Sequence, residues 1–263
     1  KNQKFFYFAL SFSILTFTFL IIAPSAHAGM IIKAPAYLGL QRGLIGCWTF
    51  DGTYTKAPDC SGNNNTGTIT GTTTRVPGRI GQALDFDGST GFVSIGQPAI
   101  LFPTAEITLS AWINPDQLTN AVQIVSNDDG TTISNQLRTQ LSGIRCSIGN
   151  TTFTTGTGYL TMGKWHHVLC KYDGANIIVF IDGVNAGNGP KTGAITYAPD
   201  DWRIGKRGDA APGYFDGRID DVRIFNRALS DGEIERLYRV GLGSTVNRTQ
   251  TSSSLSRGLV GCW

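Results

Sequence analysis

Short apolar runs with period-two alternation recur along most of the chain, and Gly, Asp and Asn separate them. The clearest stretch is residues 165–183, where two runs rich in Val, Ile, Phe and Tyr flank Asp173-Gly174 and end at Asp182-Gly183. β-Branched and aromatic runs joined by Asp-Gly are typical of a β-hairpin. The pattern therefore predicts that the chain is organised around a hairpin and not around a catalytic motif.

Similar strand candidates lie on both sides of this hairpin, and no long helical pattern separates them. Many short strands joined by Gly-rich turns predict a two-layer antiparallel sandwich. The candidates are residues 43–52, 83–86, 91–95, 107–113, 122–125, 144–148, 202–205 and 217–225.

One segment, residues 230–238, has a helical pattern instead. Ser230 and Glu233 have the spacing of a capping box, and Ile234, Leu237 and Tyr238 share one face. We expect one short helix near the C-terminus that packs on the sandwich.

The N-terminal residues read as a targeting segment. Lys1 and Lys4 precede an apolar, uncharged run over residues 5–22, and Ala26-His27-Ala28 matches a small-x-small cleavage site. We therefore predict a signal peptide over residues 1–28 and a leader over 29–42. The alternative is a retained membrane anchor, because the run is nearly long enough to span a bilayer.

Charge and size narrow the class of protein. Without Lys1 and Lys4 the chain has 20 basic and 19 acidic residues, and no basic block stands out. Nucleic-acid binders usually concentrate Lys and Arg on one face, so we expect no nucleic-acid partner. The roughly 235 residues after the predicted cleavage are enough for one large all-β domain.

A seven-residue segment occurs twice. Residues 42–48 read RGLIGCW, and residues 257–263 read RGLVGCW. The match includes Cys and Trp, so we predict one domain over 43–241, a Ser/Thr-rich linker over 242–256, and the start of a truncated second copy at 257–263.

Five cysteines in an exported chain indicate disulfide bonds. Cys47, Cys60, Cys146 and Cys170 allow three pairings, of which Cys47–Cys60 with Cys146–Cys170 is the most local. Cys262 is left over and, by the repeat, is expected to pair beyond residue 263. The absence of a C-x-x-C motif makes a zinc or redox site a weak interpretation.

Seven segments carry a resemblance to a known family: residues 48–51, 59–67, 81–88, 109–113, 165–168, 180–183 and 217–230. They resemble the laminin-G-like jelly-roll domains of secreted bacterial proteins. That family shares its sandwich with concanavalin A-like lectins, pentraxins and some glucanases. The resemblance implies an all-β, two-sheet antiparallel jelly-roll sandwich with one short C-terminal helix, and members commonly bind glycans or proteins, often with a structural calcium.

The resemblance also places the first and last strands side by side, which suggests a calcium site. Asp51, Asn63 and Asn65 lie near the first strand, and Asp220-Asp221 lies on the last. Calcium binds several carboxylate, amide and carbonyl oxygens, so these side chains are the predicted ligands of a structural Ca²⁺. The alternative is that Asp and Asn here only stabilise turns.

A second, pentraxin-like calcium site on the loops would use Asp128 and Asp209. Arg207 stands where that pattern has a carboxylate, so we interpret Asp128 and Asp209 as solvated loop residues.

Sugar binding needs accessible aromatic faces beside polar groups. Trp202, Tyr214 and Tyr159 lie near predicted loops and are the candidate ligand-binding residues. Trp48, Trp112 and Trp165 fall inside strand patterns and are expected in the core.

The competing class is an enzyme. A retaining glucanase would need paired carboxylates on one strand. The three Glu residues (Glu106, Glu233 and Glu235) do not make that motif, and adjacent His166 and His167 would face opposite ways on a strand. We therefore expect a non-catalytic module.

The sequence thus predicts a secreted or cell-surface recognition module that binds a glycan or an extracellular protein, beside further domains of the same chain and without a membrane span after cleavage. The alternatives are a structural or adhesive repeat of a long surface protein and, less favoured, a glycoside hydrolase.

Overall fold

Strands make up most of the described chain, as the alternating pattern predicts. The computed structural model describes residues 39–53, 55–118, 122–128, 130, 134–208 and 213–243. The predicted signal peptide, the leader up to residue 38, the linker beyond residue 243 and the repeated segment at 257–263 lie outside these ranges. No helix within the described ranges has the length and apolar character needed to cross a membrane.

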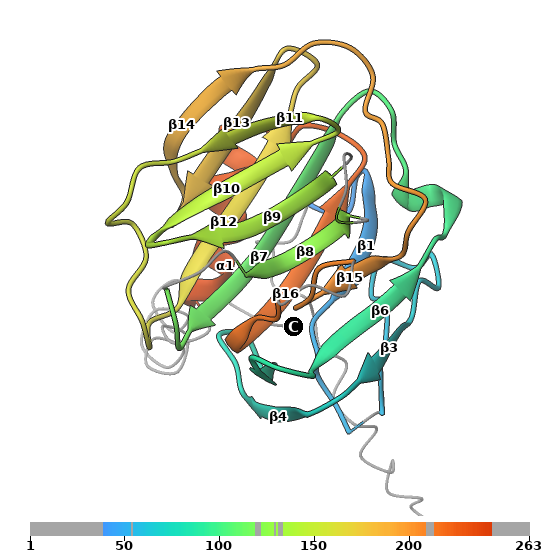
Figure 1. The fold of residues 1–263 in the computed structure, drawn as a ribbon, viewed down its shortest axis with the longest axis vertical. Coiled ribbons are helices and arrows are strands. Elements are labelled where there is room, and N and C mark those ends of the chain that lie inside the picture. The colour runs from blue at the N-terminus through green and yellow to red at the C-terminus, as the bar shows by residue number, and fades with distance from the viewer. Residues whose placement is uncertain are drawn as a thin grey trace, which may run out of the picture. The chain divides into compact units, whose positions relative to one another are not determined.

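The strands form two sheets of eight, and every pairing between them is antiparallel (Figure 1). Sheet A has the order β14-β13-β12-β7-β16-β5-β4, with β1 also paired to β16. Its strands are β1 (Leu44–Trp48), β4 (Thr73–Pro77), β5 (Gln82–Asp87), β7 (Ile107–Pro115), β12 (His166–Tyr172), β13 (Asn176–Ile181), β14 (Val184–Pro190) and β16 (Asp216–Phe225).

Sheet B lies nearer the viewer in Figure 1 and has the order β11-β10-β9-β8-β15-β6-β3-β2. Its strands are β2 (Lys56–Ala57), β3 (Gly67–Thr70), β6 (Phe92–Gly96), β8 (Gln123–Asp128), β9 (Ser134–Gln140), β10 (Gly143–Ile148), β11 (Thr151–Thr154) and β15 (Trp202–Ile204). A short 3-10 turn, η2 (Ala99–Leu101), follows β6. The predicted antiparallel sandwich is therefore confirmed.

The predicted hairpin is formed by β12 and β13. Their pairing runs from Val168 opposite Ile181 to Tyr172 opposite Ile177. At the turn between them the Asp173 carboxylate accepts hydrogen bonds from the backbone N–H groups of Ala175 and Asn176. Gly174 has φ +92°, a conformation that glycine adopts without strain.

Alternate side chains of β12 pack into two different hydrophobic clusters, one on each face of sheet A. Val168, Cys170 and Tyr172 point into the core between the sheets. Leu169 points the other way, into a second cluster that includes Ile234 and Leu237 of the helix α1 (Asp231–Gly243). Successive side chains of a strand face opposite sides, so a strand buried on both faces has no polar stripe.

Helix α1 begins with the predicted capping box. The Glu233 carboxylate accepts hydrogen bonds from the Ser230 backbone N–H and hydroxyl, each at 2.9 Å. The helix extends to Gly243, beyond the predicted end at residue 238. Gly241 lets it approach sheet A closely, because a Cβ there would lie 2.2 Å from the Trp112 ring. In the described residues α1 is the single α-helix.

The first and last strands are neighbours, as the resemblance implies. Strand β1 pairs with β16, from Leu44 opposite Phe225 to Trp48 opposite Val222.

Both disulfides of the most local pairing are present. Cys47–Cys60 links β1 to the loop before β3, and Cys146–Cys170 joins β10 of sheet B to β12 of sheet A through the core.

Candidate ligand-binding site

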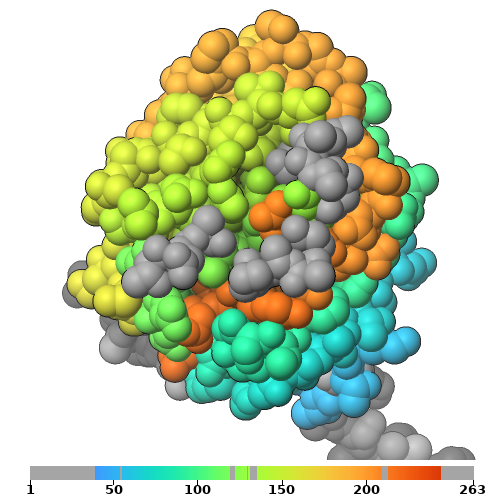
Figure 2. Space-filling view, in the orientation of Figure 1, coloured from blue at the N-terminus to red at the C-terminus, as the bar shows by residue number. Residues whose placement is uncertain are grey.

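The outer face of sheet B carries a large set of polar side chains. On β9, Leu137 points into the core, so its neighbours Gln136 and Arg138 point outward. Residues directly opposite in an antiparallel pair lie on the same face, which extends this polar surface onto β8, β10 and β11. Figure 2 looks onto this side of the molecule.

The first polar row crosses four strands. Ser126 lies opposite Gln136, Gln136 opposite Ser147, and Ser147 opposite Thr152. The Gln136 Nε2 donates to the Ser147 hydroxyl at 3.3 Å, and the Ser147 and Thr152 hydroxyls are 2.9 Å apart. With strands about 4.8 Å apart, the row is roughly 14 Å long.

The second row runs beside the first. Arg138 lies opposite both Gln123 and Arg145, and Arg145 lies opposite Thr154. Gln123 is fully buried, yet neither its Nε2 nor its Oε1 has a hydrogen-bond partner within the described ranges. Buried amides are nearly always hydrogen-bonded. The Gln123 Nε2 can therefore donate to a ligand acceptor, and its Oε1 can accept from a ligand donor. We call the two rows together the sheet B platform.

Arg138 and Arg145 are half-buried and adjacent on this platform. In the part of the chain that the structure describes, Arg138 donates one hydrogen bond, to Gln140 at 3.3 Å, and the Nε atoms of Arg138 and Arg145 have no partner. Burial, with the charges of Arg145 and Arg207, lowers the pKa of Arg138 to about 10, and Asp128 opposes the shift. Arg138 therefore carries its charge at neutral pH, and among the described residues no carboxylate forms an ion pair with either guanidinium.

Asp128 and Arg207 lie at the end of β8. The Asp128 carboxylate accepts a 2.7 Å hydrogen bond from the Gly130 N–H and lies 3.8 Å from the Arg207 Nε. Asp128 is only 5 % exposed, so the expectation that it is a solvated loop residue is wrong. It is a strand residue held by local contacts. Asp209 lies outside the described residues.

Of the predicted sugar-binding aromatics, Trp202 is fully buried in the core, so its ring faces are closed to a ligand. Its position on β15, between two strands of sheet B, explains this burial. Tyr214 is half-buried and lies 6.5 Å from Phe92 of β6, with the Lys206 ammonium over both rings. Tyr159 is 43 % exposed and bonds through its N–H to Ser142 in the β9–β10 turn.

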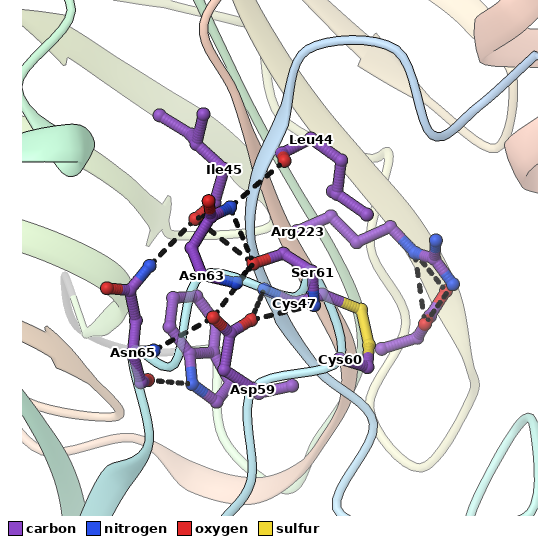
Figure 3. The surroundings of a disulfide bond; sticks show 11 residues. Leu44, Ile45, Cys47, Asp59, Cys60, Ser61, Asn63, Asn65 and Arg223 are labelled. Carbon is purple, nitrogen blue, oxygen red and sulfur yellow. Dashed lines mark hydrogen bonds and ion pairs between the residues drawn. A yellow bond between two sulfur atoms is a disulfide. The ribbon is translucent and has the colours of Figure 1, made fainter.

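The predicted calcium ligands Asn63 and Asn65 use their side-chain amide groups as donors to β1 (Figure 3). The Asn65 side-chain Nδ2 donates to the Ile45 carbonyl at 2.8 Å. The Asn65 backbone carbonyl accepts a 2.9 Å hydrogen bond from the Trp48 indole N–H. Asp59 is the centre of this loop. Its carboxylate accepts the backbone N–H groups of Cys47, Ser61 and Asn65 and the Ser61 hydroxyl.

Asp51 and Asp220 lie together against the β4–β5 turn. A Cβ on Gly81 would be 2.2 Å from an Asp51 oxygen, and one on Gly78 would be 2.6 Å from an Asp220 oxygen. Asp220 is fully buried. Its Oδ2 accepts the Ile80 N–H at 2.8 Å, and its Oδ1 has no partner. Burial, more than the nearby Asp221 and Asp51, raises the pKa of Asp220 to about 8.

Asp221 is committed elsewhere, in a bidentate ion pair with Arg223 that includes a 2.7 Å contact. Of the five predicted ligands, Asp51 and Asp220 lie beside the same turn, at Gly81 and Gly78 respectively. Over the described ranges there is no cluster of three or more His, Cys, Asp or Glu side chains suited to a metal ion.

Both histidines of β12 have hydrogen-bonding partners. His167 Nε2 lies 2.9 Å from the Ser110 hydroxyl, but both residues are buried beneath Trp112 and Tyr238. Burial lowers the pKa of His167 to about 4. His166 pairs through Nδ1 with Asp182 at 2.8 Å and accepts the Thr161 N–H.

Two kinds of comparison place the chain among known proteins. Residues 87–235 match the family model described as the concanavalin A-like lectin/glucanases superfamily, of the laminin-G type. Among solved structures, domain 4 of AbnA, a GH43 extracellular arabinanase from Geobacillus stearothermophilus in complex with arabinotriose, is similar with a TM-score of 0.62 and 21 % identity, over 74 % of this chain and 98 % of that one.

Two larger proteins contain a similar fold. The binding domain of Paraclostridial Mosquitocidal Protein 1 matches with a TM-score of 0.62 and 17 % identity, over 76 % of this chain and 53 % of that one. Trypanosoma rangeli sialidase in complex with sialic acid matches with a TM-score of 0.58 and 19 % identity, over 74 % and 32 %. This chain thus spans about half of the toxin domain and a third of the sialidase.

The family match covers more than half of the chain, and the two antiparallel sheets have the fold that it requires. The chain belongs to the laminin-G-like family of the concanavalin A-like lectin/glucanases superfamily.

Proposed function

We propose that this protein is a non-catalytic, extracytoplasmic recognition module that binds a glycan on the sheet B platform. The observation that carries the proposal is Gln123, a fully buried amide to which no described residue forms a hydrogen bond at either end. Sugar hydroxyls both donate and accept hydrogen bonds, so the hydroxyls of one sugar ring can bond to the Nε2 and the Oε1 of Gln123. The rows of Gln, Ser, Thr and Arg side chains beside it offer further partners over a length of about three sugar units, roughly 14 Å.

The comparisons support this proposal at the level of the fold. Domain 4 of the arabinanase matches 74 % of this chain over nearly its whole length and is in complex with arabinotriose. Because a fold hosts many functions, the assignment to the platform rests on its side chains and not on the likeness.

Two further features support the proposal: the glutamate contacts favour binding over catalysis, and the disulfides favour an exported location. Glu106 accepts the Ala228 N–H, and Glu233 and Glu235 pair with Arg227 and Arg239, so these carboxylates have structural roles. The disulfides are typical of oxidising compartments.

The test is a panel of immobilised oligosaccharides probed with the purified chain. We expect at least one class to bind, and the paired change Gln136→Ala with Thr152→Ala to weaken that binding tenfold or more, since each lost hydrogen bond costs about 1 kcal/mol. The control is Gln41→Ala, an exposed glutamine just before β1 of sheet A. Binding that survives the paired change would contradict the proposal.

A structural calcium at Asp51 and Asp220 is a second proposal, supported by the unpartnered Asp220 Oδ1. Backbone carbonyls of the adjacent turn would complete the oxygen ligands. Excess calcium is then expected to raise the midpoint of thermal unfolding above its value in chelator. At a calcium concentration of 100 times the Kd, the free energy of unfolding should increase by about 2–3 kcal/mol. Asp220→Asn should abolish the increase, whereas Asp173→Asn should retain it. An increase that persists in Asp220→Asn would contradict this site.

The alternative of a structural or adhesive repeat draws on the repeated RGLIGCW and RGLVGCW segments. In the described domain this segment is β1, whose Cys47 forms a disulfide and whose Trp48 fills the core. A glycan-binding module can also occur in tandem, so the platform test distinguishes a binding role from a purely structural one.

A further inference from the structure

The sheet B platform carries positive charge without matching carboxylates. Arg138 and Arg145 lie directly opposite each other on β9 and β10, and no ion pair joins either of them to an acidic residue of the described ranges. Like charges placed opposite each other in a sheet destabilise it. Within the described ranges no ion pair compensates the two charges, which leaves them available to an anionic ligand.

The described acidic residues at the end of β8 and just before β15 already have partners. Asp200 forms a bidentate ion pair with Arg203, at 2.8 and 2.9 Å. Asp201 accepts the Ser94 hydroxyl at 3.0 Å, and Asp128 lies between the Gly130 N–H and Arg207. Lys206 adds a further positive charge beside Tyr214 and Phe92 on the same face.

The geometry points to an acidic saccharide as the ligand: we propose that a carboxylate or sulfate group of a sugar sits between Arg138 and Arg145, with a neighbouring hydroxyl on Gln123. This inference rests on the proposed function and adds the substrate class. Guanidinium groups bind oxyanions through paired N–H donors, and the unpartnered Nε atoms of both arginines are such donors. Gln123 lies opposite Arg138, so the amide is next to the charged pair.

An acidic peptide would satisfy the arginines but not the rest of the platform. The rows of Gln, Ser and Thr side chains continue across β8 to β11 and offer partners for hydroxyl groups. The saccharide is therefore favoured, and the peptide is an outcome of the test.

The experiment measures binding of the full chain to four soluble probes by calorimetry: oligogalacturonate, dextran sulfate, a neutral galacto-oligosaccharide of matched length, and poly-glutamate. The variants are Arg145→Gln and Arg138→Gln. The control is Arg239→Gln, which removes the same charge from the exposed face of α1, where Arg239 pairs with Glu235. Salt is varied in each titration, because ionic contacts weaken as it rises.

We expect one acidic saccharide to bind at least tenfold more tightly than the neutral one. Each platform variant should weaken that binding by about 10- to 100-fold, the range for a lost charged hydrogen bond. Preference for oligogalacturonate assigns a carboxylate, and preference for dextran sulfate assigns a sulfate. Arg239→Gln should leave the affinity within twofold.

The outcomes separate this inference from the proposed function. Equal binding of neutral and acidic saccharides, still sensitive to Gln136→Ala with Thr152→Ala, overturns the acidic ligand and leaves glycan binding intact. Equal loss in Arg239→Gln, or poly-glutamate bound as tightly as the saccharide, also overturns it. Binding of no saccharide, here and on the immobilised panel, overturns the proposed function itself.

Discussion

Arg138 on β9 lies directly opposite Arg145 on β10, on the outer face of sheet B, and neither guanidinium has a carboxylate partner among the described residues. A protein that gained nothing from this pair would be more stable without it. The same two charges that lower the stability of the free protein are the ones expected to bind the ligand.

Arg145→Gln should stabilise the free protein while it weakens ligand binding. Removing one of two opposed like charges is expected to raise the free energy of unfolding by about 0.2–1 kcal/mol. Urea denaturation of the ligand-free chain measures this change. Arg239→Gln, which breaks an exposed ion pair on α1, should instead lower stability by about 0.3–0.5 kcal/mol. A clear loss of stability in Arg145→Gln would show that the arginine has a structural role.

Asp59 should be more important to stability than its partly exposed position suggests. Asp59→Ala leaves the N–H groups of Cys47, Ser61 and Asn65 without their acceptor, at a cost of about 3 kcal/mol. Asp59→Asn keeps one oxygen and should cost less. Asp173→Ala, which removes an exposed turn carboxylate that accepts two N–H groups, is the matched control. If the Asp59 and Asp173 variants lose equal stability, the loop does not depend on Asp59.

The two disulfides should differ in their resistance to reductant. Cys60 is exposed, whereas Cys146 and Cys170 are fully buried between the sheets. A thiolate must reach a sulfur to break the bond, so mild reduction of the folded protein should open Cys47–Cys60 first. Alkylation and mass spectrometry give the order. Once both are open, each lost crosslink should reduce stability by about 3 kcal/mol. Early alkylation of Cys170 would contradict the buried crosslink.

His167 should lower the free energy of unfolding in mildly acidic solution, whereas the buried Asp220, whose pKa is raised to about 8, acts in the opposite direction. Its pKa is about 4 in the folded state and about 6.5 in the unfolded chain. Between these values the unfolded state binds a proton that the folded state does not, so stability present above pH 6.5 is lost as the pH falls toward 4. The full effect is about 3 kcal/mol.

Unfolding free energies measured between pH 7 and 4.5 test this, with His167→Gln as the comparison. The variant keeps a group that can face Ser110 but does not titrate, so its stability should change less with pH over this range. Parallel pH profiles for the two proteins would exclude His167 as the cause.

The sequence was sufficient for the sandwich because its fold depends on local patterns. Asp-Gly turns, alternating strands and the Ser230–Glu233 capping box are each encoded in a few adjacent residues. The most local cysteine pairing was also the one observed.

The platform could not be found in this way, because it depends on which strands are neighbours. Gln136-x-Arg138 and Arg145-x-Ser147 show the outward polar alternation, but only the register places Arg138 opposite Arg145. Gln123 reaches the same face next to a β-bulge, which no periodicity reveals. Trp202 was misassigned for the related reason that β15 lies inside sheet B. Asn63 and Asn65 have the residue types of calcium ligands, and only their contacts show that they donate to β1.

The central claim is that glycans bind on the sheet B platform, and side-chain NMR tests it most directly. The chain is labelled with ¹⁵N, and the Gln123 amide and the Arg138 and Arg145 Nε–H signals are followed while an oligosaccharide from the binding panel is added. We predict saturable shifts in these three signals and none in the Arg239 Nε–H on α1. Saturable binding that leaves all three signals unchanged would contradict the account, because the glycan would then bind elsewhere.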